Sequence, residues 1–177
     1  MKILVLTGSP HRHGSTDLLA NEFIRGAEEA GHEVTRFDAA FSTIRPCLGC
    51  DGCRESGVCV QKDDMAAVLD ALLQADLVAL VTPLYYYGIS AQLKAVIDRF
   101  YAKDAAIHEK KHKAVLLCAA AATDDWTMEA LECHFKIICR YLHWEDCGKV
   151  LAEGCGSVEL TKASEYPEKA YELGLGL

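Results

Sequence analysis

Short, unbroken apolar segments recur along the chain and alternate with segments of helical periodicity. Three of them are Ile3–Leu6, Leu77–Val81 and Ala114–Cys118. Apolar runs of this length that end at turn residues are typical of strands buried on both faces. Such strands occur in parallel sheets that helices cover on each side. The pattern therefore predicts an α/β protein, a doubly wound sheet in a three-layer α/β/α arrangement.

Weaker patterns complete the set of elements. Apolar and polar residues alternate over His32–Asp38, which predicts a second strand. The segment Cys147–Ala152 predicts a fifth strand, although Gly148 weakens the strand pattern. Apolar spacings of three and four predict helices that begin at Ser15, at Asp63 or Asp64, at Ser90 and near Met128, with a last helix over Ser164–Leu173. Nothing resembling a linker divides the chain, so we expect residues 1–177 to form one domain. Residues 39–64 have no period and form a cysteine-rich segment, here called the cysteine loop.

Charge and cysteine content narrow the class of protein. The chain has 18 Lys plus Arg against 26 Asp plus Glu, a net charge of −8, which argues against nucleic acid and anionic membranes as partners. Its longest apolar run, Ala114–Ala122, falls well short of the roughly 18 residues of a membrane span. The start of the chain resembles no secretory signal. We therefore expect a cytoplasmic protein whose nine cysteines are free thiols rather than a disulfide framework.

Ligands of doubly wound sheets bind at the carboxyl ends of the strands. That edge is predicted to carry four loops: Gly8–Thr16, Ala39–Asp63, Thr82–Ser90 and Ala119–Asp125. Any binding or redox chemistry is expected there. The sequence offers no nucleophile–base pair and no paired carboxylates, so we predict no catalytic side chain and expect cofactors to carry the chemistry.

The loop after the first strand has the composition of a phosphate site. Ser9, Ser15 and Thr16 supply hydroxyls, and His11 adds a further donor, at a predicted helix N-terminus whose free N–H groups attract anions. The triphosphate loop and the dinucleotide fingerprint are both excluded, because no Lys follows the second glycine and Pro10 replaces a required glycine. A phosphomonoester fits what remains. The alternative is a plain strand-to-helix turn with Ser15 as the N-cap.

The loop after the third strand places three consecutive tyrosines at the same edge. Tyr85, Tyr86 and Tyr87 offer flat apolar faces with polar tips, which suit stacking on a planar ring. Pro83 and Leu84 precede them, and Gly88 permits close approach of the backbone. Together with a phosphate site, this loop indicates a mononucleotide with a planar base, for which FMN is the leading candidate. The alternative is that the tyrosines only pack between helices.

The cysteine loop carries the pattern C-x2-C-x2-C-x5-C at Cys47, Cys50, Cys53 and Cys59. Three cysteines at successive spacings of three are similar to the bacterial iron–sulfur run. Zinc sites more often pair two distant knuckles. We therefore favour a [4Fe-4S] cluster and keep zinc and an empty or redox-active thiol loop as alternatives. The other five cysteines are interpreted as interior residues: Cys118, Cys133, Cys139, Cys147 and Cys155.

Three segments together, GSPHRHGST, PCLGCDGCRESGVCVQKDDM and PLYYYGISAQLKAVIDRF, resemble the iron–sulfur flavoproteins, a branch of the flavodoxin-like NAD(P)H-dependent FMN reductases. The resemblance implies a five-stranded sheet of order 2-1-3-4-5, and homodimers or homotetramers with FMN at subunit interfaces. It implies a [4Fe-4S] cluster beside the flavin, with NAD(P)H as a possible donor. By position, Ser9, His11, Ser15 and Thr16 would hold the phosphate, Pro83 through Gly88 would border the ring, and Cys47, Cys50, Cys53 and Cys59 would bind the cluster.

The chain departs from the family pattern at two positions. His11 stands where Arg is usual, and Ser15 where Asn is usual. Both residues keep hydrogen-bonding capacity. The leading hypothesis is an oxidoreductase that passes electrons between FMN and a [4Fe-4S] cluster, with a small-molecule or protein donor or acceptor. The alternatives are a cluster-free NAD(P)H-dependent FMN or quinone reductase, and a zinc- or redox-sensing thiol module.

Overall fold

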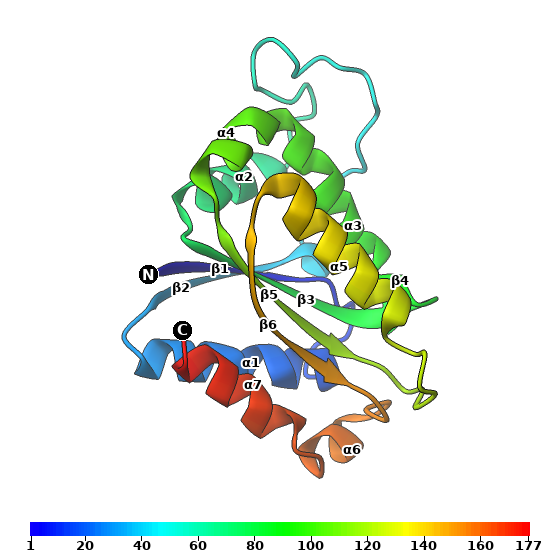
Figure 1. Ribbon diagram of the computed structural model, residues 1–177. Coiled ribbons are helices and arrows are strands. Elements are labelled where there is room, and N and C mark those ends of the chain that lie inside the picture. The colour runs from blue at the N-terminus through cyan, green and yellow to red at the C-terminus, as the bar shows by residue number, and fades with distance from the viewer.

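Parallel strands form the centre of the structure, a computed structural model that describes residues 1–177 (Figure 1). The strands are β1 (Lys2–Thr7), β2 (Glu33–Asp38), β3 (Leu77–Tyr85), β5 (Lys113–Ala119) and β6 (Glu145–Ala152), in the order β2-β1-β3-β5-β6. A two-residue strand, β4 (Gly88–Ile89), pairs antiparallel with the end of β3. Apart from β4, the order is the predicted one, and the flavodoxin-like doubly wound topology is confirmed.

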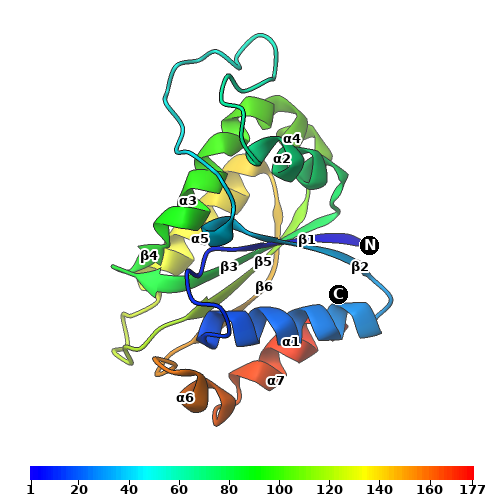
Figure 2. The same cartoon turned by 180° about the vertical axis from the view of Figure 1, so that it is seen from behind.

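Helices cover both faces of the sheet. One face carries α1 (Ser15–Glu29), α6 (Val158–Lys162) and α7 (Tyr166–Leu175) (Figures 1 and 2). The opposite face carries α2 (Met65–Gln74), α3 (Ala91–Asp98), α4 (Asp104–Lys110) and α5 (Glu129–Leu142). Two 3₁₀ turns, η1 (Ala39–Phe41) and η2 (Arg99–Lys103), follow β2 and α3. None of the helices combines the length and apolar character that crossing a bilayer requires.

Successive side chains of each strand point to opposite faces of the sheet, so the interior consists of two cores. In β1, Leu4 and Leu6 point into the core beneath α2, α3 and α5, whereas Ile3 and Val5 point into the core beneath α1 and α7. All four side chains are buried. The unbroken apolar runs therefore correspond to strands with two buried faces, as predicted.

Two segments differ from the prediction. β3 continues four residues past Val81, because its end forms a hairpin with β4. The polar segment Glu109–Lys113, for which the sequence predicts no helix or strand, contains the end of α4 and the start of β5. Within it His112 is buried, with Nε2 2.8 Å from the Leu72 carbonyl oxygen, and burial lowers the pKa of its imidazole. The polar composition of the segment gives no sign that His112 is buried.

The C-terminal helix docks on α1 through two glycines, Gly26 and Gly174. A Cβ atom on Gly174 would overlap the Phe23 carbonyl oxygen and lie 2.8 Å from the Ala27 nitrogen. A Cβ atom on Gly26 would likewise overlap the Tyr171 carbonyl oxygen. The two helices therefore pack backbone to backbone, and small residues at the crossing are required.

Replacing Gly174 by alanine should lower the free energy of unfolding by about 2–3 kcal/mol, because α7 must move away from α1. Urea denaturation followed by circular dichroism measures this change. Gly88→Ala is the matched control, since its Cβ would meet only the Tyr85 carbonyl oxygen at 3.9 Å. Equal stabilities of the two variants would contradict the packing described above.

Candidate functional site

A cavity of about 540 Å³ opens at the carboxyl ends of β1, β3 and β5. Its walls come from the β1–α1 loop, from Pro83–Tyr85, from Ala119–Ala121 and from Cys155–Val158. Seven of the predicted cofactor residues lie around it: Ser9, His11, Ser15, Thr16, Pro83, Leu84 and Tyr85. The fold thus brings the phosphate-type loop and the start of the aromatic loop together in one cavity.

The N-terminus of α1 faces this cavity without a side-chain cap. Gly14 is the N-cap residue and makes no side-chain hydrogen bond to the first turn. Ser15 is the first helical residue, so its predicted alternative role as N-cap is wrong. Ser9 and Thr16 are 8% and 3% exposed and line the cavity beside this turn. An uncapped helix end with buried hydroxyls beside it fits an anion such as a phosphate.

Hydrogen bonds lock the β1–α1 loop to the loop that follows β3. The Ser90 hydroxyl donates to the Gly8 carbonyl oxygen at 2.8 Å and accepts from the Leu93 N–H at 3.4 Å. The Ser90 N–H in turn donates to the Thr82 hydroxyl oxygen at 3.0 Å. A Cβ atom on Gly8 would overlap the Ser90 hydroxyl. The two loops approach each other so closely that position 8 must be glycine. Their contact fixes the relative positions of the two cavity walls.

The three tyrosines separate at the β3–β4 hairpin. Tyr85 lines the cavity, but Tyr86 and Tyr87 form a two-residue turn with φ angles of 47° and 60°. Tyr86 is fully exposed, and the ring of Tyr87 packs on Trp126 at 4.9 Å between centroids. Neither of these two tyrosines nor Gly88 lines the cavity of this chain.

Tyr86→Asn should raise the free energy of unfolding by about 1 kcal/mol. A bulky residue is strained at a positive φ, whereas Asn is favoured at this place in a turn whose two central residues both have positive φ. Tyr86→Ala removes the same exposed ring without relieving the strain, and should give no gain. Urea denaturation of the three proteins tests this, and an equal gain for Ala would assign the effect to the ring instead.

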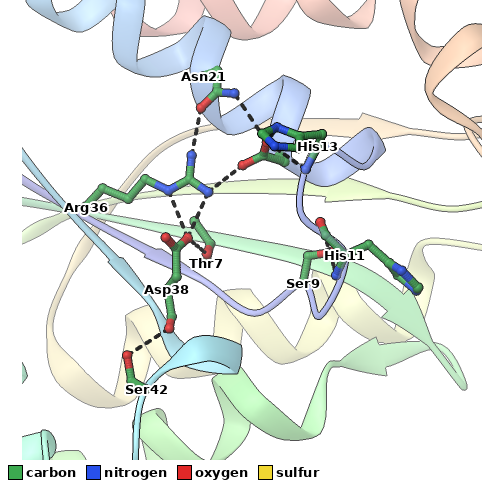
Figure 3. Close-up of polar contacts among 9 residues, drawn as sticks. Thr7, Ser9, His11, His13, Asn21, Arg36, Asp38 and Ser42 are labelled. Atoms are coloured by element: carbon green, nitrogen blue, oxygen red, sulfur yellow. Dashed lines mark hydrogen bonds and ion pairs between the residues drawn. The ribbon is translucent and has the colours of Figure 1, made fainter.

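A cluster of charged and polar side chains connects the ends of β1 and β2 to the start of α1 (Figure 3). Arg36 pairs with Asp17 at 2.5 Å and with Asp38 at 2.8 Å, and it also donates to Asn21. The Thr7 hydroxyl donates to Asp38 at 2.5 Å. Asp38 ends β2, and its carboxylate links Thr7, at the end of β1, to Arg36, which in turn pairs with Asp17 of α1. The pairs hold the start of α1 in place beside the cavity.

The cysteine loop leaves the edge of the sheet and rises over the helical layer of α2, α3 and α4 (Figures 1 and 2). None of its four cysteines lines the cavity. The loop begins at the predicted edge, directly after β2, but its cysteines lie outside the cavity. Its ends are held together by hydrogen bonds, from the Thr43 N–H to Asp64 at 2.7 Å and from the Asp64 N–H to the Thr43 carbonyl oxygen at 3.1 Å. The residues between Thr43 and Asp64 extend away from the carboxyl ends of the strands.

The four thiols of the cysteine loop differ in burial. Cys53 and Cys59 are half-buried against the larger core, whereas Cys47 and Cys50 are exposed. Burial raises the pKa of the Cys53 thiol, and negative charge on the other three raises it further. No three His, Cys, Asp or Glu side chains come close enough together to hold a metal ion. Four soft sulfur donors on one segment fit zinc or an iron–sulfur cluster by their chemistry.

The five remaining cysteines are not all interior residues. Cys118, Cys139 and Cys155 are buried, and burial raises the pKa of the Cys139 thiol to about 12. Cys147 is half-buried. Cys133 lies on the solvent face of α5 and is exposed, so the prediction is wrong for it.

Sequence reasoning missed the segment Cys155–Val158, which supplies one wall of the cavity. The segment follows β6, whose carboxyl end lies at the same edge as those of β1 and β3. Ser157 and the glycines before it, directly after a predicted strand, were a usable signal. The weak pattern of that strand concealed it.

The chain resembles several known proteins in sequence. The family model described as NADPH-dependent FMN reductase matches residues 1–154. An iron–sulfur flavoprotein of Methanocaldococcus jannaschii is 38% identical over 99 residues, 56% of this chain and 51% of that protein. A putative NAD(P)H-dependent FMN-containing oxidoreductase of Bacillus subtilis is 30% identical over 101 residues, 56% of this chain and 52% of that protein. The aligned region spans about half the length of these curated relatives.

Solved structures share the fold at low sequence identity. An NAD(P)H:quinone oxidoreductase from Methanothermobacter marburgensis superposes with a TM-score of 0.77 at 20% identity, covering 99% of this chain and 95% of that one. An FMN-dependent NADH-azoreductase from Bacillus anthracis, in complex with FMN, gives 0.73 at 15% identity, covering 98% and 97%. Likeness at this level of identity supports the flavodoxin-like fold.

Proposed function

Because the chain belongs to the NADPH-dependent FMN reductase family, whose model matches residues 1–154, we propose that it is an oxidoreductase that passes electrons between FMN and a [4Fe-4S] cluster. The observation that carries the flavin half is the cavity with the uncapped N-terminus of α1. Bound FMN would accept the two electrons of a hydride, from NAD(P)H as donor, and release them singly.

The residues around the cavity divide into two groups by chemistry. The hydroxyls of Ser9, Ser15 and Thr16, the side chain of His11 and the first-turn N–H groups of α1 would hold the phosphate. Pro83, Leu84 and Tyr85 would border the ring. Tyr86, Tyr87 and Gly88 lie outside the cavity at the hairpin tip, and in a homodimer or homotetramer they could border a flavin held by a neighbouring copy.

The cluster half rests on the donor set of the cysteine loop. Cys47, Cys50, Cys53 and Cys59 would be the ligands, and an iron–sulfur flavoprotein is among the relatives of this chain. Because none of these four cysteines lines the cavity of its own chain, we place electron transfer between the two groups across an interface between copies. Association into a homodimer or homotetramer is therefore part of the proposal.

A cluster-free NAD(P)H-dependent FMN or quinone reductase is the second candidate. The observation that favours it is the separation of the four cysteines of the loop from the cavity, together with the lack of a closed metal-binding group. A zinc- or redox-sensing thiol module would use the same cysteines, but it leaves the cavity and the uncapped helix without a role.

Iron, acid-labile sulfide, zinc and flavin analysis of the anaerobically purified protein separates the three candidates. The proposal expects about four iron atoms and one FMN per chain, and a brown protein that dithionite bleaches. Stoichiometric flavin without iron or sulfide would leave the cluster-free reductase. Stoichiometric zinc without flavin would leave the thiol module.

A further inference from the structure

The side chain of Arg99, the first residue of η2, is buried at the base of the cysteine loop. It is 2% exposed, and its Nη1 donates to the Asp63 carboxylate at 2.5 Å and to the Arg45 carbonyl oxygen at 3.1 Å. Asp63 is 1% exposed and also accepts from the Arg45 N–H at 3.1 Å and the Met65 N–H at 3.3 Å. Arg99 therefore joins the two ends of the loop that carries the four cysteines.

The ion pair remains charged although both groups are buried. Burial favours the neutral carboxyl of Asp63, but the hydrogen bonds from Arg99, Arg45 and Met65 outweigh it, and the pKa of Asp63 is lowered. Removing either partner would leave a buried charge unpaired, so the fold requires both members of the pair.

One donor of this buried guanidinium has no partner. The Nε–H of Arg99 makes no hydrogen bond, and a buried donor without a partner is costly. Cys59 and Arg99 line the same cavity of about 380 Å³. Of the four cysteines of the loop, Cys59 is the one that shares a cavity with this unpartnered donor.

We propose that Arg99 donates its Nε–H to the sulfur of Cys59, and that it thereby positions this cysteine and stabilises added negative charge on the group that the cysteine loop holds. The first part concerns the chain alone. The second part rests on the proposed function, because it requires a redox-active cluster on the loop. Arg99 is then a positioning residue that favours the reduced state, since hydrogen bonds and positive charge near cluster sulfurs raise the potential.

The contact is tested on the protein without its cluster. The Nε–H resonance of Arg99 in a ¹⁵N-edited NMR spectrum should shift clearly in Cys59→Ala and stay unchanged in Cys47→Ala, whose thiol is exposed and outside the Arg99 cavity. An unchanged resonance in Cys59→Ala would overturn the proposed hydrogen bond.

The effect on redox state is tested in a double variant. Arg99→Gln alone would leave Asp63 buried and unpaired, so Arg99→Gln is combined with Asp63→Asn. We expect the one-electron reduction of its cluster to become about tenfold less favourable, a fall in potential of about 59 mV. Lys103→Gln, which removes a less buried cation from the same cavity, should change the equilibrium less than about threefold.

An unchanged potential in the double variant would overturn the second part of the inference. A fall of equal size in Lys103→Gln would also overturn it, because the effect would then be one of general charge. If the wild-type protein holds no cluster, the proposed function and the redox role both fail. The NMR comparison still decides whether Arg99 contacts Cys59.

Discussion

FMN should bind about 10- to 100-fold more weakly when Thr16 is replaced by valine. Thr16 is 3% exposed, lies in the uncapped first turn of α1 and lines the cavity. Valine has the same shape but cannot donate a hydrogen bond to a phosphate oxygen, and a hydrogen bond to a charged group contributes about 1.5–3 kcal/mol. Titrating apoprotein into FMN, with quenching of flavin fluorescence as the signal, measures the dissociation constant.

Thr127→Val is the matched control for this measurement. Thr127 is also buried, but it lies outside the cavity and its hydroxyl has no hydrogen-bond partner. The control should bind FMN as the wild type does and unfold with an equal or larger free energy, because it removes a buried unpaired hydroxyl. Equal dissociation constants for Thr16→Val and the wild type would contradict the assignment of the phosphate site.

Iron content should fall from about four atoms to less than about one per chain when Cys53 is replaced by alanine. Cys53 is the third of the four cysteines and is half-buried against the larger core. Losing this ligand leaves only three sulfur donors and opens the site to water. Iron and sulfide are measured after anaerobic reconstitution, with FMN content as an internal reference that should not change.

Cys133→Ala provides the comparison for this variant. Cys133 is an exposed thiol on α5, outside the cysteine loop. It should retain the iron content of the wild type. The ligand assignment would be wrong if both variants kept their iron, and an equal loss in both would indicate that iron binds to thiols non-specifically.

Most of the sheet could be predicted from the sequence, because strands buried on both faces leave unbroken apolar runs. Leu77–Val81 and Ala114–Cys118 both lie within the observed strands β3 and β5. Helix α4 could not be predicted in the same way. Its single buried residue, Ile107, produces no periodicity that distinguishes a helix from a loop.

The site could be predicted only where it is local in sequence. Ser9, His11 and Thr16 lie within one strand-to-helix loop, and the fold brings that loop to the cavity as expected. The place of the cysteine loop depends on the buried pair of Asp63 and Arg99, which are 36 residues apart, and no local pattern reports such a contact. The left-handed turn at Tyr86 is likewise invisible in a sequence that lacks the usual Asn-Gly signal.

The most direct test of the central claim is an anaerobic titration of the purified protein with NADPH, followed by optical and electron paramagnetic resonance spectra. The account predicts that the flavin is bleached and that the signal of a reduced iron–sulfur cluster then appears. In Cys53→Ala the flavin should still be bleached, but the cluster signal should be absent. Complete reduction of the flavin in the wild type with no cluster signal at any stage would contradict electron transfer between the two groups.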